Sequence, residues 1–290
     1  KDAFCASAGL HPDRVALVDL DHTFPVENRP LVDVTRGKMT YEERDATIPK
    51  IAETLVSLMA RHPEESGLVH CHSYAIQDAL EDELAARGVG DRVRSHDSED
   101  RDGQLAAWKR SDDPTVFLSV KMEEALDLDG DLCRWQLLTK APYPNTRDSR
   151  VAQRLEDGDW AWYYRSALRT VIQAAGRIVR SPDDYGVTYL ADSSLLDLFD
   201  RARTDMPGWF ADQVDRMDRP DLPAADPNAA LAGLSSDRSS GGASRSGSSG
   251  SRRSGRRWSA SADSSCSTSP TAPSGAHPRS RTPTCPAGKP

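Results

Sequence analysis

The sequence predicts an α/β fold, with a mostly parallel sheet that is covered by helices on both faces. Short apolar runs typical of buried strands occur at 68–71, 116–120, 135–138 and 187–190. Segments with apolar residues at helical spacing stand between these runs. Strands that alternate with helices at this spacing indicate βαβ units, and βαβ units build parallel sheets.

Residues 1–66 are expected to form a lead-in segment. The apolar run within 14–20 predicts a strand, and the proline-bounded stretch 24–30 predicts an extended connector. Apolar residues at 48, 51, 52, 55, 58 and 59 follow Thr47. They predict an amphipathic helix with Thr47 at its N-cap.

Residues 67–217 are expected to form the folded domain. Besides the four strands above, a short strand is predicted at 92–94. Helices are predicted around 76–84 with Gly88 ending the first, around 105–108, from about 160 to 180, and over 195–203.

Residues 218–290 are expected to be disordered, since prolines and then Ser, Gly and Arg dominate and few side chains could be buried. The last 56 residues, 235–290, contain 18 serines, nine Lys or Arg and two Asp or Glu. The other 234 residues carry 28 basic and 43 acidic side chains, a net charge of −15. Two interpretations stay open, an ordinary acidic protein or one adapted to the salty cytoplasm of a halophilic archaeon, and the acidic excess favours the second.

Several classes of protein are excluded or disfavoured by composition. No run approaches the ~18 apolar residues of a transmembrane helix, and no secretory signal is visible, so we expect a cytoplasmic protein without a membrane partner. The five scattered cysteines form no C-x-x-C pair. No G-x-x-x-x-G-K-[ST] phosphate loop and no G-x-G-x-x-G fingerprint occur, which excludes a self-sufficient ATPase. The chain does not begin with Met, and we expect it to be part of a longer protein.

The predicted helix 160–180 carries a polar stripe near its end. On a helix, Gln173, Arg177 and Arg180 would lie within roughly 60° of arc, with Gly176 beside them. Two guanidiniums on one line are suited to a polyphosphate. The alternative is a solvated basic helix end that complements the helix dipole.

Acidic residues follow the predicted strand 116–120. Glu124 and Asp127 are three positions apart, so a helical turn would place them on one side. Loops at the carboxyl ends of strands bind ligands in α/β sheets. The alternative is an acidic surface turn in an already acidic protein.

Polar residues also end the first strand of the domain. His70 and His72 would share one strand face, but without a third ligand nearby a zinc site is improbable. Ser73 and Tyr74 would stand at a strand-to-helix turn, where they could bond a phosphate and stack on a base or sugar. The alternative is that Ser73 caps the following helix.

The sequence contains three stretches that resemble helicase motifs IV, V and VI: residues 67–74, residues 124–128, and Gln173-x-x-Gly176-Arg177-x-x-Arg180 followed by Asp184. Together they are similar to the second RecA-like domain of XPD/DinG-like superfamily 2 DNA helicases. The resemblance runs from about Phe24 to Asp192, and the motif VI stretch is its most specific part.

The resemblance implies that two RecA-like domains clamp ATP between them. The first domain, absent from this chain and expected in cis, would supply the phosphate loop, hold Mg²⁺ and carry any iron–sulfur cluster. In this chain Arg177 and Arg180 would act as arginine fingers on the γ-phosphate. Gln173, Gly176 and Asp184 would bind or couple the nucleotide to domain closure.

The same resemblance assigns the two remaining loops. Glu124 and Asp127 would sense the nucleotide, and Ser73 and Tyr74 would contact single-stranded DNA. The family has Gly where Ala125 stands, so the backbone turn expected there is in question. No iron or other metal is assigned to this chain.

The implied function is ATP-driven translocation on single-stranded DNA in repair, with this chain inactive by itself. A truncated, catalytically inactive module that binds a nucleic acid or a partner is the alternative. The discriminating feature is a phosphate loop supplied by an upstream segment or a second polypeptide.

Overall fold

The computed structural model describes residues 2–18, 20, 22–120, 128 and 130–234. Its sheet has the strand order β1-β6-β5-β2-β4-β3, and each pair of neighbours is parallel. The strands are β1 Leu31–Gly37, β2 Gly67–His70, β3 Val93–Arg94, β4 Val116–Ser119, β5 Trp135–Leu138 and β6 Val187–Asp192. The predicted α/β class is confirmed, and the parallel sheet is the RecA-like arrangement that the resemblance implies.

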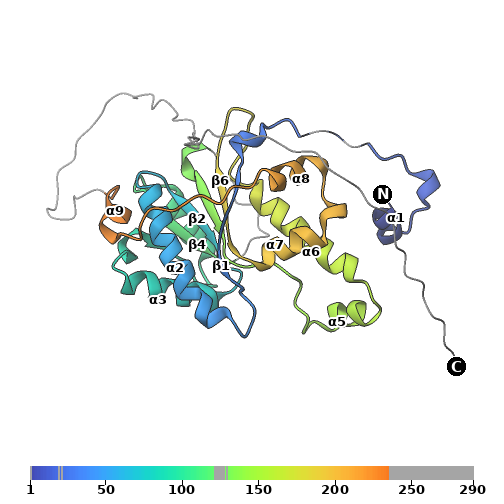
Figure 1. Cartoon of the computed structure of the whole chain (residues 1–290), viewed down its shortest axis with the longest axis horizontal. Helices are drawn as coiled ribbons and strands as arrows, with labels where there is room; N and C mark the ends of the chain where they lie inside the picture. The colour runs from blue at the N-terminus through green and yellow to red at the C-terminus, as the bar shows by residue number, and fades with distance from the viewer. Residues whose placement is uncertain (1, 19, 21, 121–127, 129, 235–290) are drawn as a thin grey trace, which may run out of the picture. The chain divides into compact units, whose positions relative to one another are not determined.

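Helices cover both faces of this sheet (Figure 1). One face packs against α2 Arg44–Arg61, α3 Tyr74–Ala86 and α9 Pro227–Leu231. The opposite face packs against α4 Arg101–Lys109, α6 Trp160–Ala175, α7 Ser194–Arg201 and α8 Gly208–Asp215. The remaining helices are α1 Asp2–Ala8 and α5 Ser149–Glu156. Short 3-10 turns are found at Pro12–Arg14, Val26–Asn28, Gly90–Arg92, Gly130–Leu132 and Arg203–Asp205.

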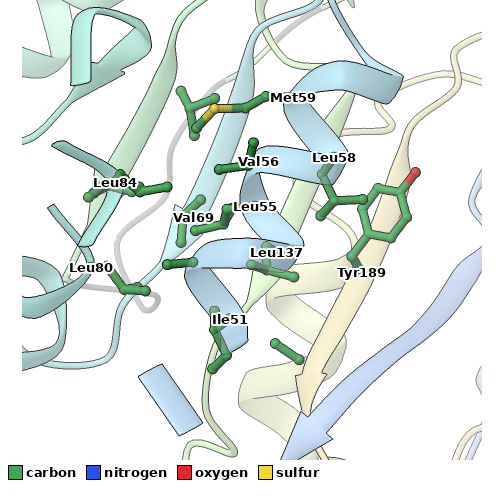
Figure 2. Packing of buried hydrophobic residues seen from close by; sticks show 14 of the residues in the cluster. Ile51, Leu55, Val56, Leu58, Met59, Val69, Leu80, Leu84, Leu137 and Tyr189 are labelled. Atoms are coloured by element: carbon green, nitrogen blue, oxygen red, sulfur yellow. The ribbon is translucent and has the colours of Figure 1, made fainter. Parts of the chain in front are cut away.

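Helix α2 provides the largest apolar face of the core. Ile51, Leu55 and Leu58 are fully buried and lie over Val69 and Leu137 of the sheet (Figure 2). Burying side chains of this size stabilises the fold by about 1.5–3 kcal/mol each. The amphipathic helix predicted from these positions is confirmed.

The N-terminal boundary of that helix was predicted wrongly. Helix α2 begins at Arg44, and Glu43 rather than Thr47 occupies the N-cap position. Thr47 lies inside the helix, where its hydroxyl donates a hydrogen bond of 3.0 Å to the carbonyl of Lys38. Thr47 thus ties the helix to the end of β1.

The lead-in segment also differs from its prediction. No strand forms among the described residues of 14–20, and the side chains of Leu17 and Val18 are 66% and 76% exposed. A strand needs a neighbour to satisfy its backbone, and the described residues supply none there. Strand β1 was not predicted; it pairs with β6 and makes residues 31–37 of the lead-in an edge strand of the sheet.

Order extends beyond the predicted limit at Met217. Asp218 pairs with Val32 at the edge of the sheet, and Leu222 packs against the core. Helix α9 lies on α2 with Ala230 fully buried. The expectation of disorder is therefore wrong for residues 218–234, because a few apolar side chains suffice to dock this segment. Residues 235–290 lie outside the described part.

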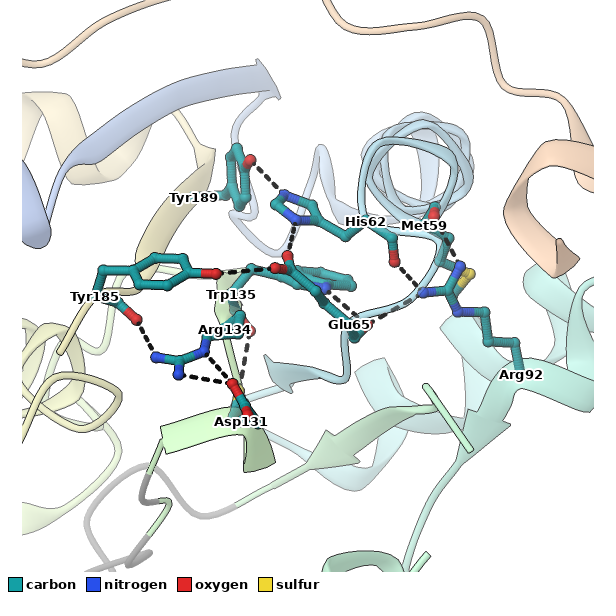
Figure 3. Close-up of polar contacts among 10 residues, drawn as sticks. Met59, His62, Glu65, Arg92, Asp131, Arg134, Trp135, Tyr185 and Tyr189 are labelled. Carbon is teal, nitrogen blue, oxygen red and sulfur yellow. Dashed lines mark hydrogen bonds and ion pairs between the residues drawn. The ribbon is translucent and has the colours of Figure 1, made fainter. Parts of the chain in front are cut away.

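A buried arginine joins several elements at the amino ends of the strands. The Arg92 side chain is fully buried, and burial lowers its pKa to about 10, so the guanidinium stays positive at neutral pH. It donates hydrogen bonds to the carbonyls of Met59, His62, Glu65, Pro114 and Ala230 (Figure 3 shows several of these). One side chain thereby donates hydrogen bonds to backbone carbonyls at the end of α2, in the loop before β4 and in α9.

Next to Arg92, a polar chain connects α2 to β6. His62 bonds Tyr189 Oη through Nε2 at 2.8 Å and Glu65 through Nδ1 at 2.7 Å. Glu65 also accepts from the hydroxyl of Tyr185, and the ring of His62 stacks on Trp135 (Figure 3). These contacts fix the loop that enters β6.

We predict that Arg92→Met lowers the free energy of unfolding by roughly 3 kcal/mol or more, because buried carbonyls lose their donor. Urea unfolding of the full chain measures this. Arg94→Met is the matched control, since Arg94 is only partly buried and donates to the carbonyls of Asp91 and Val93. Equal losses for the two variants would contradict the role given to Arg92.

Candidate functional site

The arginines singled out in the sequence follow α6 instead of belonging to it. Helix α6 ends at Ala175, and Gly176 takes the C-cap position. Residues 176–178 turn, and 179–180 have no regular structure. The predicted continuation of the helix to 180 is wrong, and Gln173, Arg177 and Arg180 do not share one helical stripe.

The residues that follow the helix pack against the sheet. Residues 177–179 are all buried. After leaving the helix, the chain packs Ile178 and Val179 against Leu68 and Phe117.

The residues of the predicted polar stripe differ in their exposure to solvent. Gln173, Gly176 and Arg180 are exposed, whereas the Arg177 residue is only 8% exposed. Arg177 therefore lies at the boundary between the sheet face and solvent, with Arg180 outside it.

Two other guanidiniums lie close enough to Arg177 to affect its pKa. Burial lowers the pKa of Arg177, and the charges of Arg180 and Arg101 lower it further. Arg101 is the first residue of α4 and is also 8% exposed. Guanidiniums gathered in this way favour a ligand with several negative charges. Arg101 could not be predicted as a site residue, since nothing in the local pattern links it to Arg177, some 76 positions away.

Asp184 holds the loop that leads from Arg180 into β6. Its Oδ1 forms an ion pair of 2.6 Å with Nη1 of Arg134, and its Oδ2 accepts from the backbone N–H of Arg180 at 3.0 Å. The guanidinium of Arg134 also lies over the ring of Tyr185, 4.4 Å from its centroid. Asp184 is thus engaged within the domain, and its contact to residues 177–180, called the arginine segment below, runs through the backbone of Arg180.

Ser73 and Tyr74 lie at the carboxyl end of β2, as predicted. Ser73 occupies the N-cap position of α3, but its hydroxyl makes no capping bond. Tyr74 packs its ring edge-on against His96, with centroids 5.7 Å apart. His72 has a positive φ of 62° beyond the end of the strand, so the prediction that His70 and His72 share a strand face is wrong.

Glu124, Asp127 and Ala125 lie outside the described residues. The segment that contains them follows β4, whose last residue Ser119 is the register partner of His70. The chain therefore leaves β2 and β4 at adjacent positions of the same sheet edge.

An aromatic cluster, defined as Tyr143, Trp160, Tyr163 and Tyr164, lies where α6 begins. Tyr143 stacks on Tyr163 with centroids 5.2 Å apart, and Trp160 stacks on Tyr164 at 6.2 Å. Trp160 is half exposed, and Arg201 lies over the ring of Tyr164. This cluster was not predicted, although the dense aromatic run over 160–164 is visible in the sequence.

The cluster lies at the same sheet edge as Ser73 and Tyr74. Tyr143 belongs to the loop after β5, and β5 is the parallel neighbour of β2. The half-exposed ring of Trp160 and the guanidinium of Arg201 are suited to stacking on a base and pairing with a phosphate.

Within the described part of the chain, no three His, Cys, Asp or Glu side chains converge as a metal site requires. None of the described helices is both long enough and apolar enough to cross a membrane.

Comparison with known proteins identifies similar sequences. The helicase C-terminal domain family matches residues 55–213. The human regulator of telomere elongation helicase 1 is 32% identical over 117 residues, which are 34% of this chain and 9% of the human protein. The Saccharomyces cerevisiae general transcription and DNA repair factor IIH helicase subunit XPD/RAD3 is 24% identical over 217 residues, 67% of this chain and 25% of the yeast protein. The chain thus spans at most about a quarter of the length of these relatives.

Solved structures also resemble the chain. The structure of S. tokodaii Xpd4 is 21% identical, with a TM-score of 0.43 over 62% of this chain and 38% of that one. A structure titled XPD_Helicase is 18% identical, with a TM-score of 0.46 over 60% of this chain and 34% of that one.

We predict that His70 makes stability depend on pH. Burial lowers the pKa of His70 to about 4, the bond to Gln136 opposes this and the charge of Arg177 adds to it. In the unfolded chain His70 becomes protonated near pH 6.5, whereas in the folded chain it stays neutral down to about pH 4. The free energy of unfolding should therefore fall as pH drops from 6.5 to 4, by up to roughly 1.4 kcal/mol per pH unit from this residue.

Urea unfolding at pH 7, 6 and 5 tests this for wild type and His70→Gln, which cannot titrate. The variant should show the shallower decline, because the other histidines are common to both chains. Parallel declines would mean that His70 does not contribute.

Proposed function

Because the chain belongs to the family of helicase C-terminal domains, we propose that it is the second motor domain of an ATP-dependent DNA helicase. The observation that carries this proposal is the arginine segment, in which Arg177 is nearly buried beside the charges of Arg101 and Arg180. Such a cluster can stabilise the negative charge that develops on a transferring phosphoryl group.

The nucleotide would be shared with a first motor domain. The sequence has no phosphate loop, so a first domain in cis would hold ATP and Mg²⁺, and any iron–sulfur cluster would lie there too. The guanidiniums of this chain fit the phosphate end of ATP, since their fork geometry suits phosphate oxygens. Arg177 and Arg180 would close on the γ-phosphate, with Gln173, Gly176 and the loop held by Asp184 at the rim. Glu124 and Asp127, which follow β4 in the sequence, would sense the nucleotide.

Single-stranded DNA would cross the carboxyl edge of the sheet. The aromatic cluster would supply stacking surfaces, and Ser73 and Tyr74 would contact the backbone at the same edge. Translocation on single-stranded DNA in repair is the activity that this arrangement would serve.

We predict that Arg177→Ala lowers the rate of DNA-stimulated ATP hydrolysis about 10³-fold when the chain is joined to its first motor domain. ATP binding should change only a few-fold, because the first domain holds most of the nucleotide. Arg180→Ala should behave similarly. Steady-state hydrolysis and nucleotide-binding titrations measure the two effects.

Arg169→Ala is the matched control, since Arg169 is exposed on α6 before the arginine segment. It should hydrolyse ATP like wild type. Wild-type hydrolysis by Arg177→Ala would refute the finger role, and so would a joint loss of binding and hydrolysis in a folded protein.

We predict that Trp160→Ala weakens binding of single-stranded DNA about tenfold, because a stacked base contributes about 1–3 kcal/mol. Fluorescence anisotropy with a labelled oligothymidine measures this at one fixed salt concentration. Tyr41→Ala is the control, because Tyr41 is an exposed aromatic residue outside the cluster. Equal affinities for Trp160→Ala and wild type would exclude the aromatic cluster from the DNA path.

A further inference from the structure

A hydrogen-bonded chain connects the end of β2 to the arginine segment. Nε2 of His70 lies 3.0 Å from Oε1 of Gln136. The Gln136 amide nitrogen donates to the carbonyl of Ala174 at 2.9 Å and to Oγ1 of Thr188 at 2.8 Å. The same Ala174 carbonyl accepts from the backbone N–H of Arg177 at 3.1 Å. His70, Gln136 and Ala174 are fully buried, so solvent cannot replace any of these bonds.

This chain determines which ring nitrogen of His70 carries the proton. Both amide hydrogens of Gln136 are already donated, so its oxygen must accept from His70. His70 therefore carries its proton on Nε2, and Nδ1 is a lone-pair acceptor. Among the described residues, that buried Nδ1 has no hydrogen-bond partner. A buried acceptor of this kind costs about 1–3 kcal/mol unless a donor reaches it.

Two possible donors share a sheet face with this nitrogen: the hydroxyl of Ser119, the register partner of His70, and the guanidinium of Arg177. His70 is two residues after Leu68 on β2, so both side chains lie on the same face of the sheet. That face is covered by Ile178 and Val179, the residues directly after Arg177. The charge of Arg177 is felt at the His70 ring, as its effect on the His70 pKa indicates. A guanidinium has five N–H donors, enough to bond a phosphate and an imidazole together.

Resting on the function proposed above, we infer that His70 and Gln136 are positioning residues for Arg177. Gln136 holds the end of α6 through the Ala174 carbonyl. Nδ1 of His70 accepts one guanidinium N–H of Arg177 when another edge of the guanidinium faces the γ-phosphate. His70 also ends the strand that leads to Ser73 and Tyr74. His70 and Gln136 therefore connect the proposed DNA contacts of Ser73 and Tyr74 to the proposed arginine finger, Arg177.

The test measures ATP hydrolysis by the chain joined to its first motor domain, with saturating single-stranded DNA. His70→Phe removes both ring nitrogens while keeping an aromatic side chain. It should lower kcat about tenfold, the usual effect of a lost bond to a charged group, and leave KM for ATP within about twofold. His70→Gln can donate to Gln136 and accept from Arg177, so it should retain near wild-type kcat.

Two further variants separate positioning from stability. Gln136→Met is similar in length and removes the hold on Ala174, so it should show the same selective loss of kcat, which keeps the test usable if His70→Phe does not fold. Thr139→Val is the matched control, because the Thr139 hydroxyl bonds only the backbone carbonyl of His70 at 2.7 Å. It should lower stability without lowering kcat.

Wild-type kcat in both His70→Phe and Gln136→Met, together with loss of hydrolysis in Arg177→Ala, would overturn this inference alone. An equal loss of kcat in His70→Gln and His70→Phe would also overturn this inference, since it would show that a hydrogen-bond acceptor at position 70 does not support kcat. Unchanged hydrolysis in Arg177→Ala would instead overturn the proposed function, and the inference with it.

Discussion

The packing of residues 176–180 against the sheet is the constraint on which the candidate site depends. Helix α6 ends at Ala175, and the segment after it buries Ile178 and Val179, holds Arg177 at the sheet face and leaves Arg180 exposed. A helix that continued to 180 would have kept both guanidiniums on a solvated stripe, where water and salt weaken their charge. The observed turn surrounds one of them with protein, where a charge interacts more strongly with a ligand.

Helix α6 places the two proposed contact regions at opposite ends of one element. It begins at the aromatic cluster and ends beside the arginine segment. Its 16 residues span about 24 Å at 1.5 Å per residue. The end near the arginines is held by Gln136 at the carbonyl of Ala174, and the segment after it by Asp184, which accepts from the backbone N–H of Arg180.

Local pattern was enough to predict most strands, most helices and the parallel sheet, because strand and helix periodicities are properties of short segments. Local pattern failed where contacts with a segment distant in the sequence determine the structure. The segment after Ala175 packs on a sheet face formed by Leu68 and Phe117, and the strand predicted over 14–20 finds no neighbour among the described residues. The His70–Gln136 bond joins residues 66 positions apart, so no local spacing could indicate it. The positions of Ser73 and Tyr74 were predictable because they follow directly from the end of a strand.

We propose that this chain completes an ATPase that it cannot form alone. The most direct measurement is ATP hydrolysis with single-stranded DNA by the chain alone, by the first motor domain alone and by the two joined, at low and at molar salt. We predict hydrolysis only in the joined protein. Hydrolysis by this chain alone would contradict the account, and a folded joined protein that binds DNA without hydrolysing ATP would identify the chain as an inactive binding module.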